Sequence, residues 1–194
     1  AIWPLFHYFI QYSVFSQNQW DSYVEVNKKF AEAVINNVED GDIIWVHDYQ
    51  LLLCPKMIRD QKPNITLGFF LHIPFPSFEI FRIFPWREEL LKGILGADQI
   101  GFHTYDYVRH FLSSVKRILK YDVDFNRIDL GSRKVVVDTF PMGIDFEKFN
   151  LKKVPIRAII LEILDSQSSG RTPCGQISGQ IQSKIQPARL RIMA

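Results

Sequence analysis

Two short stretches place side chains capable of chemistry directly after apolar, strand-forming runs. The run "IIWV" is followed by His47, Asp48 and Tyr49, and the run "ITLGFFL" is followed by His72 and a Pro-Phe-Pro turn. Because proline is excluded from central strands and helix interiors, the second run must end there. A carboxylate can accept hydrogen bonds from ligand hydroxyls, and a sugar ring offers several of them. Both stretches are therefore candidate parts of a ligand site.

Each stretch also has a simpler interpretation. Asp48 can serve as a helix N-cap, because Asp is a preferred capping residue. His47 and His72 can be structural histidines that hydrogen-bond to the backbone. Polar residues that follow two strands ending at the same edge of a sheet nevertheless favour a ligand site.

The elements that must position these residues follow from hydrophobic periodicity. An amphipathic helix over 20–38 is indicated by apolar residues at every third or fourth position, namely Trp20, Tyr23, Val26, Phe30, Val34 and Val38. Further helices are expected at 51–59, in two pieces on either side of Pro85, and from an N-cap at Thr104 to Leu119. Strands are expected at 43–46, 65–71 and 98–102, with two more joined at Gly131-Ser132.

This alternation of helices and strands predicts an α/β fold. The strands are too apolar to be half solvated, which is typical of a parallel sheet covered by helices on both faces. In such sheets, ligands bind beyond the carboxyl ends of the strands. We therefore expect His47, Asp48, Tyr49 and His72 to face one common crevice.

Composition excludes several classes of protein. A net charge of +2 argues against a dedicated nucleic-acid binder. No apolar run approaches about 18 residues and the start has no secretory leader, so we expect neither a membrane span nor secretion. Cys54 and Cys174 lie far apart and lack metal-ligand spacing, which indicates a reducing, cytoplasmic location and no metal.

Other features have two interpretations each. Arg82 and Arg87 flank Pro85 and can pair with phosphate, but Glu88 and Glu89 are local partners and a solvated face is the default. The aromatic cluster around Trp3 can stack on a sugar or belong to the core.

Taken together, these stretches closely resemble the trehalose-6-phosphate synthase family, from about residue 2 to 150. The matching segments are "IWPLFHY", "WDSYVEVNKKFAEAV", "DGDIIWVHDYQLLLCPKMIR", "GFFLHIPFPSFEIFRIFPWREELLKGILGADQIGFHTYDYVRHFLSSVKRIL" and "PMGIDFEKF". The resemblance implies a retaining glycosyltransferase with two Rossmann-like domains, which needs no metal or cofactor and transfers glucose from UDP-glucose to glucose 6-phosphate. Residues 1–150 would be part of the first, acceptor-binding domain, and 151–194 a divergent, poorly ordered tail rich in Gln, Ser and Gly.

The resemblance also assigns roles to individual residues. Asp48 would hold the attacking hydroxyl of glucose 6-phosphate, with Trp3 and Tyr49 in the acceptor pocket. His72 would lie beside the transferred glucose of the donor. Asp48 and His72 are thus the expected catalytic residues, acting through positioning and electrostatics.

The sequence also departs from the family. The glycine-rich loop with its phosphate-binding Arg, an acceptor-site Tyr, and the Arg and Lys that neutralise the leaving UDP are not found in it. We therefore expect the chain alone to be inactive. The alternative is a non-catalytic subunit that binds sugar phosphate or regulates a synthase complex. An isolated half of a two-domain cleft would also be prone to form homo-oligomers.

Overall fold

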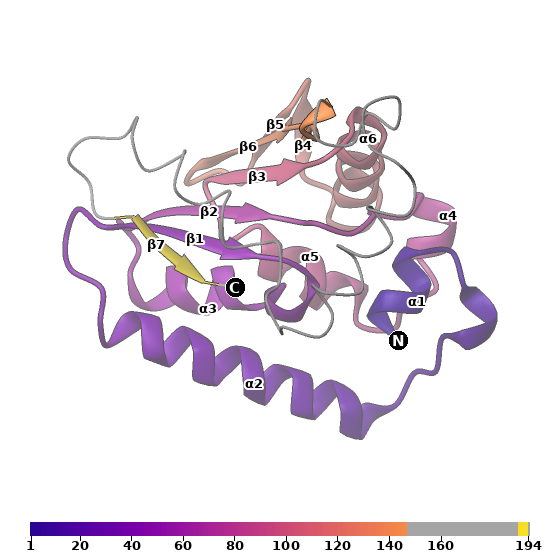
Figure 1. Ribbon diagram of the computed structural model, residues 1–194, viewed down its shortest axis with the longest axis horizontal. Coiled ribbons are helices and arrows are strands. Elements are labelled where there is room, and N and C mark those ends of the chain that lie inside the picture. The colour runs from indigo at the N-terminus through magenta and orange to yellow at the C-terminus, as the bar shows by residue number, and fades with distance from the viewer. Residues whose placement is uncertain (147–189, 194) are drawn as a thin grey trace, which may run out of the picture. The chain divides into compact units, whose positions relative to one another are not determined.

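The computed structural model describes residues 1–146 and 190–193 (Figure 1). Within them lies a seven-stranded sheet with the order β4-β5-β6-β3-β2-β1-β7. The strands are β1 Ile43–His47, β2 Thr66–Phe70, β3 Gln99–Phe102, β4 Asp122–Asp124, β5 Arg127–Asp129, β6 Lys134–Thr139 and β7 Leu190–Met193. Five of them pair in parallel, and β4 and β5 form an antiparallel edge. The predicted α/β class is confirmed, with a mixed rather than an all-parallel sheet.

The helices largely follow the sequence prediction. They are α1 Ile2–Phe6, α2 Gln17–Ile35, α3 Cys54–Gln61, α4 Phe78–Phe81, α5 Arg87–Ile94 and α6 Tyr105–Ser114, with 3-10 turns at Ile10–Tyr12 and Tyr49–Leu51 and a π-helix at Val115–Leu119. Pro55 lies in the first turn of α3, and Pro85 separates α4 from α5, as expected. Thr104 is the N-cap residue of α6, but its side chain makes no capping hydrogen bond.

The two faces of the sheet differ. One face is buried and carries Ile44, Val46, Leu67, Phe69, Ile100, Phe102, Val135 and Val137. At the alternate positions, Trp45, His47 and Gly68 are half-buried, whereas Phe70 and Gly101 are buried. The chain moves across the sheet in one direction as it passes from β1 to β2, from β2 to β3 and from β3 to β6. Because crossover connections between parallel strands are right-handed, the helices in these connections lie on the same face of the sheet. The predicted sheet flanked by helices is confirmed.

All of these elements belong to one compact unit, whose described residues are 1–141 and 190–193. The predicted tail, 151–194, lies outside the described residues except for Leu190–Met193, which pair with β1 as strand β7. No helix in the described ranges is both long enough and apolar enough to cross a bilayer.

Candidate active site

Three of the predicted residues meet where β1 and β2 end. The backbone N–H of Asp48 donates to the carbonyl of Phe70 at 2.8 Å, which extends the β1–β2 ladder by one bond. The Asp48 carboxylate then accepts the backbone N–H of His72 at 3.2 Å. His47 Nδ1 lies 2.8 Å from His72 Nε2, so the two rings share a hydrogen bond. We call His47, Asp48 and His72 the strand-end cluster.

Asp48 holds an unusual backbone conformation. Its φ of 66° and ψ of 176° fall in a region that is essentially restricted to glycine. A non-glycine residue there costs on the order of 1–3 kcal/mol, so the surrounding contacts must hold it in place. Its second carboxylate oxygen, Oδ2, has no hydrogen-bond partner among the described residues and remains open to a ligand.

The surroundings of the two histidines favour the neutral form of each ring. Burial, together with the neighbouring His72, lowers the pKa of His47 to about 4, although Asp48 acts in the opposite direction. Burial also lowers the pKa of His72, against the effect of Asp48, and His103 adds to the decrease. Because each neutral imidazole has one donor and one acceptor nitrogen, the shared bond leaves the second nitrogen of His72 for a ligand.

His103 is a neighbour of this cluster that was not predicted from the sequence. Its ring centroid lies 5.6 Å from that of His72 and 5.0 Å from that of Phe70. The signal was present in the sequence, because His103 directly follows β3 just as Asp48 follows β1. The rule that polar residues at strand ends meet would have found it.

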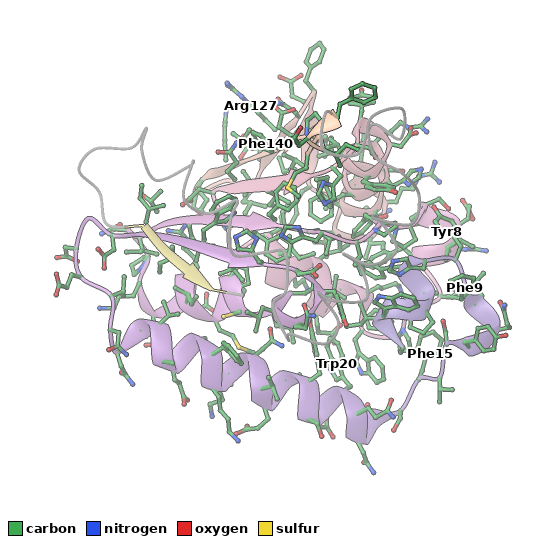
Figure 2. All side chains as sticks on the ribbon, viewed as in Figure 1. Tyr8, Phe9, Phe15, Trp20, Arg127 and Phe140 are labelled. Atoms are coloured by element: carbon green, nitrogen blue, oxygen red, sulfur yellow. The ribbon has the colours of Figure 1, made fainter. Side chains whose placement is uncertain are left out.

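Tyr49 and Trp3 lie in a separate aromatic pocket of about 230 Å³. Its lining also includes Trp20, Tyr23 and Trp86, and Trp20 stacks on Trp86 with ring centroids 4.9 Å apart. Trp20 is labelled at the N-terminal part of α2 in Figure 2. Trp3 is 46% exposed and stacks on His7, so it is not the core residue of the simpler interpretation. Aromatic walls of this kind suit the apolar faces of a sugar.

Helix α2 anchors the segment after Asp48. The Tyr23 hydroxyl donates to the carbonyl of Tyr49 at 2.7 Å and accepts the N–H of Leu52 at 3.1 Å. The fully buried Asn27 donates to the carbonyl of Gln50, and its Oδ1 accepts the N–H groups of Leu53 and Cys54. Burial raises the pKa of the Tyr23 hydroxyl well above its ordinary value. Neither anchor was predicted from the sequence, because α2 was interpreted as carrying a simple apolar stripe.

The loop after His72 is also held from several sides. Tyr8, beside α1 in Figure 2, accepts the backbone N–H of Ser77 at 2.9 Å. His110 Nδ1 bonds to the carbonyl of Phe75 at 3.1 Å. The Phe75 ring is fully buried against Phe6, Phe81, Phe102 and Phe111. These contacts fix the direction in which the chain leaves His72.

A model of glycosyltransferase family 20 matches residues 1–166. The chain belongs to this family. It is 52% identical over 153 residues to a UDP-forming α,α-trehalose-phosphate synthase of Pichia angusta, a match that covers 76% of this chain and 32% of the relative. The chain thus spans about a third of the length of that curated relative.

Several solved structures share this fold. An E. coli trehalose-6-phosphate protein bound with UDP-2-fluoro glucose superposes with a TM-score of 0.74 at 30% identity, covering 84% of this chain and 37% of that one. A Burkholderia xenovorans synthase in complex with glucose 6-phosphate superposes with a TM-score of 0.71 at 26% sequence identity. This match covers 82% of this chain and 37% of that one. The N-terminal domain of Candida albicans trehalose-6-phosphate phosphatase superposes with a TM-score of 0.72 at 39% sequence identity. This match covers 86% of this chain and 36% of that one. These likenesses confirm the predicted fold class, of which the chain has the N-terminal part.

Proposed function

We propose that this family 20 chain carries the acceptor side of a retaining glycosyltransferase that moves glucose from UDP-glucose to glucose 6-phosphate, forming trehalose phosphate. The observation that carries the proposal is the convergence of Asp48 and His72, from two different strand ends, within 3.2 Å of each other. Relatives that share the fold include proteins bound with glucose 6-phosphate and with a UDP-glucose analogue.

In this proposal, Asp48 binds the attacking hydroxyl of glucose 6-phosphate. Its Oδ2 is available for that hydrogen bond, and its strained backbone is fixed by the bonds to Phe70 and His72. A carboxylate held in this way does not have to reorganise when the hydroxyl approaches. Trp3 and Tyr49, in the neighbouring aromatic pocket, bind the rest of the acceptor sugar.

His72 acts on the donor side. As the bond from glucose C1 to the UDP oxygen breaks and the bond from C1 to the acceptor oxygen forms on the same face, C1 becomes oxocarbenium-like and positively charged. The proton of the attacking hydroxyl passes to the departing phosphate oxygen of UDP, which lies on that face. A neutral imidazole adds no opposing positive charge and can still hydrogen-bond the glucose. The lowered pKa values of His47 and His72 favour that neutral state at neutral pH.

The test separates binding from turnover. The purified chain is titrated with glucose 6-phosphate by calorimetry, and UDP release from UDP-glucose is measured in the same preparation. Asp48→Asn is expected to weaken glucose 6-phosphate binding about tenfold or more, because a carboxylate hydrogen bond is replaced by a neutral one. Asp60→Asn, an exposed change on α3, is the matched control and should bind as the parent does. Absence of glucose 6-phosphate binding would contradict the proposal.

The non-catalytic alternative stays a second prediction. The phosphatase N-terminal domain matches this chain at 39% identity, below the 52% of the Pichia angusta synthase. Under this alternative, the chain binds glucose 6-phosphate but releases no UDP in any assembly that contains it. Membership of a synthase complex or a homo-oligomer stays a prediction, which sedimentation of the purified chain would test.

We also infer a cytoplasmic location. Cys54 is a free, buried thiol whose pKa is raised to about 12 by burial, so it persists as an unreactive thiol. A buried free thiol is in keeping with a reducing compartment. Fluorescent tagging of the chain in its own cells would check the location.

A further inference from the structure

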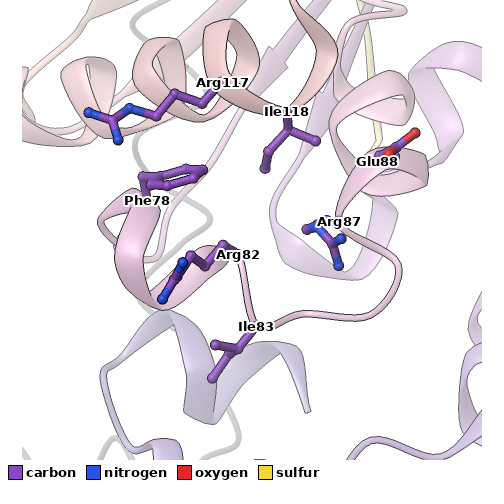
Figure 3. A pocket seen from close by; sticks show the side chains of 7 residues that line it. All are labelled: Phe78, Arg82, Ile83, Arg87, Glu88, Arg117 and Ile118. Atoms are coloured by element: carbon purple, nitrogen blue, oxygen red, sulfur yellow. The ribbon is translucent and has the colours of Figure 1, made fainter.

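A second pocket, of about 460 Å³, lies between α4, α5 and the π-helix (Figure 3). It shares no residue with the strand-end cluster or the aromatic pocket. Three arginines line it, Arg82, Arg87 and Arg117, and we call it the arginine pocket. We propose that the arginine pocket binds a small phosphate-bearing molecule. This inference goes beyond the proposed transferase function and does not depend on it.

The cations of this pocket are incompletely neutralised. Glu79 is shared by two of them, at 3.4 Å from Arg82 and 3.9 Å from Arg117. Arg87 donates to the carbonyl of Phe84 at 3.2 Å and has no ion pair with a carboxylate in the described part of the chain. Two of the guanidinium groups therefore share one carboxylate and the third pairs with none among the described residues, which leaves an excess of positive charge.

The acidic residues beside Arg87 do not remove this excess. Glu88 lines the pocket, but its carboxylate pairs with Lys92 at 3.3 Å. Figure 3 shows that carboxylate pointing away from the other lining side chains. The solvated face that the sequence made the default is present at Arg82, which is 60% exposed, but the carboxylate that pairs with it is Glu79 rather than Glu88 or Glu89.

Apolar side chains complete the lining. Phe78, Ile83 and Ile118 lie among the arginines, and the guanidinium of Arg117 stacks over the Phe78 ring at 4.8 Å. Such stacking orients the planar guanidinium without using its N–H donors. The pocket thus combines an anion-binding part with an apolar part, as a phosphate ester requires.

The helix that supplies Arg117 and Ile118 is itself irregular. Both residues lie on the π-helix Val115–Leu119, which ends at Lys120 in the left-handed conformation, with φ of 62°. π-helical turns are rare and occur frequently at functional sites. This turn brings a cation and an apolar side chain from consecutive positions to the same pocket.

Guanidinium geometry narrows the ligand class. The planar fork of donors matches phosphate oxygens in a bidentate manner, and clusters of Arg are typical phosphate sites. A volume of about 460 Å³ is in the usual range for small-molecule pockets. The same chemistry fits the phosphate of a sugar phosphate and the diphosphate of a nucleotide, so the experiment has one arm for each.

The chain is titrated with inorganic pyrophosphate by calorimetry and by amide NMR shifts. We expect saturable binding with shifts centred on α4, α5 and the π-helix. Arg87→Gln and Arg117→Gln should each raise the Kd for pyrophosphate about tenfold, because each removes a charge-assisted hydrogen bond. Arg109→Gln is the matched control and should leave the Kd unchanged, since Arg109 lies on α6 and pairs with Asp106.

Three outcomes would overturn the proposal: no saturable binding of pyrophosphate, an unchanged Kd in both pocket variants, or an equal rise in the control. Displacement of pyrophosphate by glucose 6-phosphate supports a sugar phosphate as the ligand, and displacement by UDP supports a nucleotide. Asp48→Asn should leave pyrophosphate binding intact. Failure of the transferase proposal and failure of this one are therefore distinguishable.

Discussion

The strand-end cluster and the arginine pocket are built in opposite ways. In the cluster, Asp48 has a short side chain and an uncommon backbone φ. It is held by hydrogen bonds to neighbouring backbone groups, and Asn27 of α2 anchors the segment that follows it. In the arginine pocket, long side chains extend from helix surfaces, and Arg82 and Arg117 are 60% and 59% exposed. The first arrangement is pre-organised and costs stability, whereas the second can change its geometry around a ligand at little cost to the fold.

The largest expected effect comes from removing the anchor under the cluster. Asn27→Ala leaves the N–H groups of Leu53 and Cys54 and the carbonyl of Gln50 without their buried partner. We expect a loss of about 3 kcal/mol in the free energy of unfolding, because each unsatisfied buried group costs about 1–3 kcal/mol. Urea denaturation measures it, with the exposed Asn18→Ala in the same helix as the control. An equal, small loss in both variants would contradict the anchoring role.

The next effect tests the strain at Asp48. Asp48→Gly should be more stable than Asp48→Ala by about 1–2 kcal/mol, because only glycine adopts this φ and ψ without strain. At Asp60, in the last turn of α3, the order should reverse, since glycine is less favourable than alanine in a helix by about 1 kcal/mol. Thermal denaturation of the four variants gives the comparison. The same order at both positions would show that Asp48 is not strained.

A smaller effect concerns pH. His47 has a pKa of about 4 in the folded protein, below its ordinary value of 6.5, so the unfolded chain binds the proton first. The free energy of unfolding should therefore fall as the pH falls from about 6.5 to about 4. Below about pH 4, His47 should cause no further loss. We expect about 1 kcal/mol after allowing for solvent screening of a partly exposed ring.

His47→Gln should flatten that part of the stability profile, which denaturation at a series of pH values would show. His72 titrates in the same direction, since its pKa is also lowered, and some slope should therefore remain. A profile as steep as the parent's would mean that His47 does not contribute.

The smallest effect belongs to the arginine pocket. Arg82→Gln should change the free energy of unfolding by about 0.5 kcal/mol or less, because exposed ion pairs contribute little. The same variant should weaken pyrophosphate binding in the calorimetric assay. A loss of more than about 2 kcal/mol would instead show that Arg82 supports the fold.

Much of the fold could be predicted because its signals are local. Strand-forming runs, the break at Pro85 and the first-turn position of Pro55 depend on only a few neighbouring residues. The convergence of His47, Asp48 and His72 also follows from one topological rule applied to short runs.

What could not be predicted depends on contacts distant in sequence. Val26 and Phe30, placed on the apolar stripe of α2, are 45% and 40% exposed, while Asn27 is fully buried. An isolated Asn in a helix gives no sign that a loop more than 20 residues away supplies its partners. The positive φ of Asp48 and the π-helix are likewise invisible in a sequence pattern, since both are imposed by packing.

The pairing of β7 with β1 has a consequence for biosynthesis. Leu190 lies beside Ile43 in the sheet, although about 150 residues separate them in the chain. While the chain is being made, the outer edge of β1 has no β7 to pair with, and an open strand edge is a site of aggregation. Closing so long a loop is slow. A nascent chain that carries β1 through β6 thus exposes this edge until β7 has been synthesised.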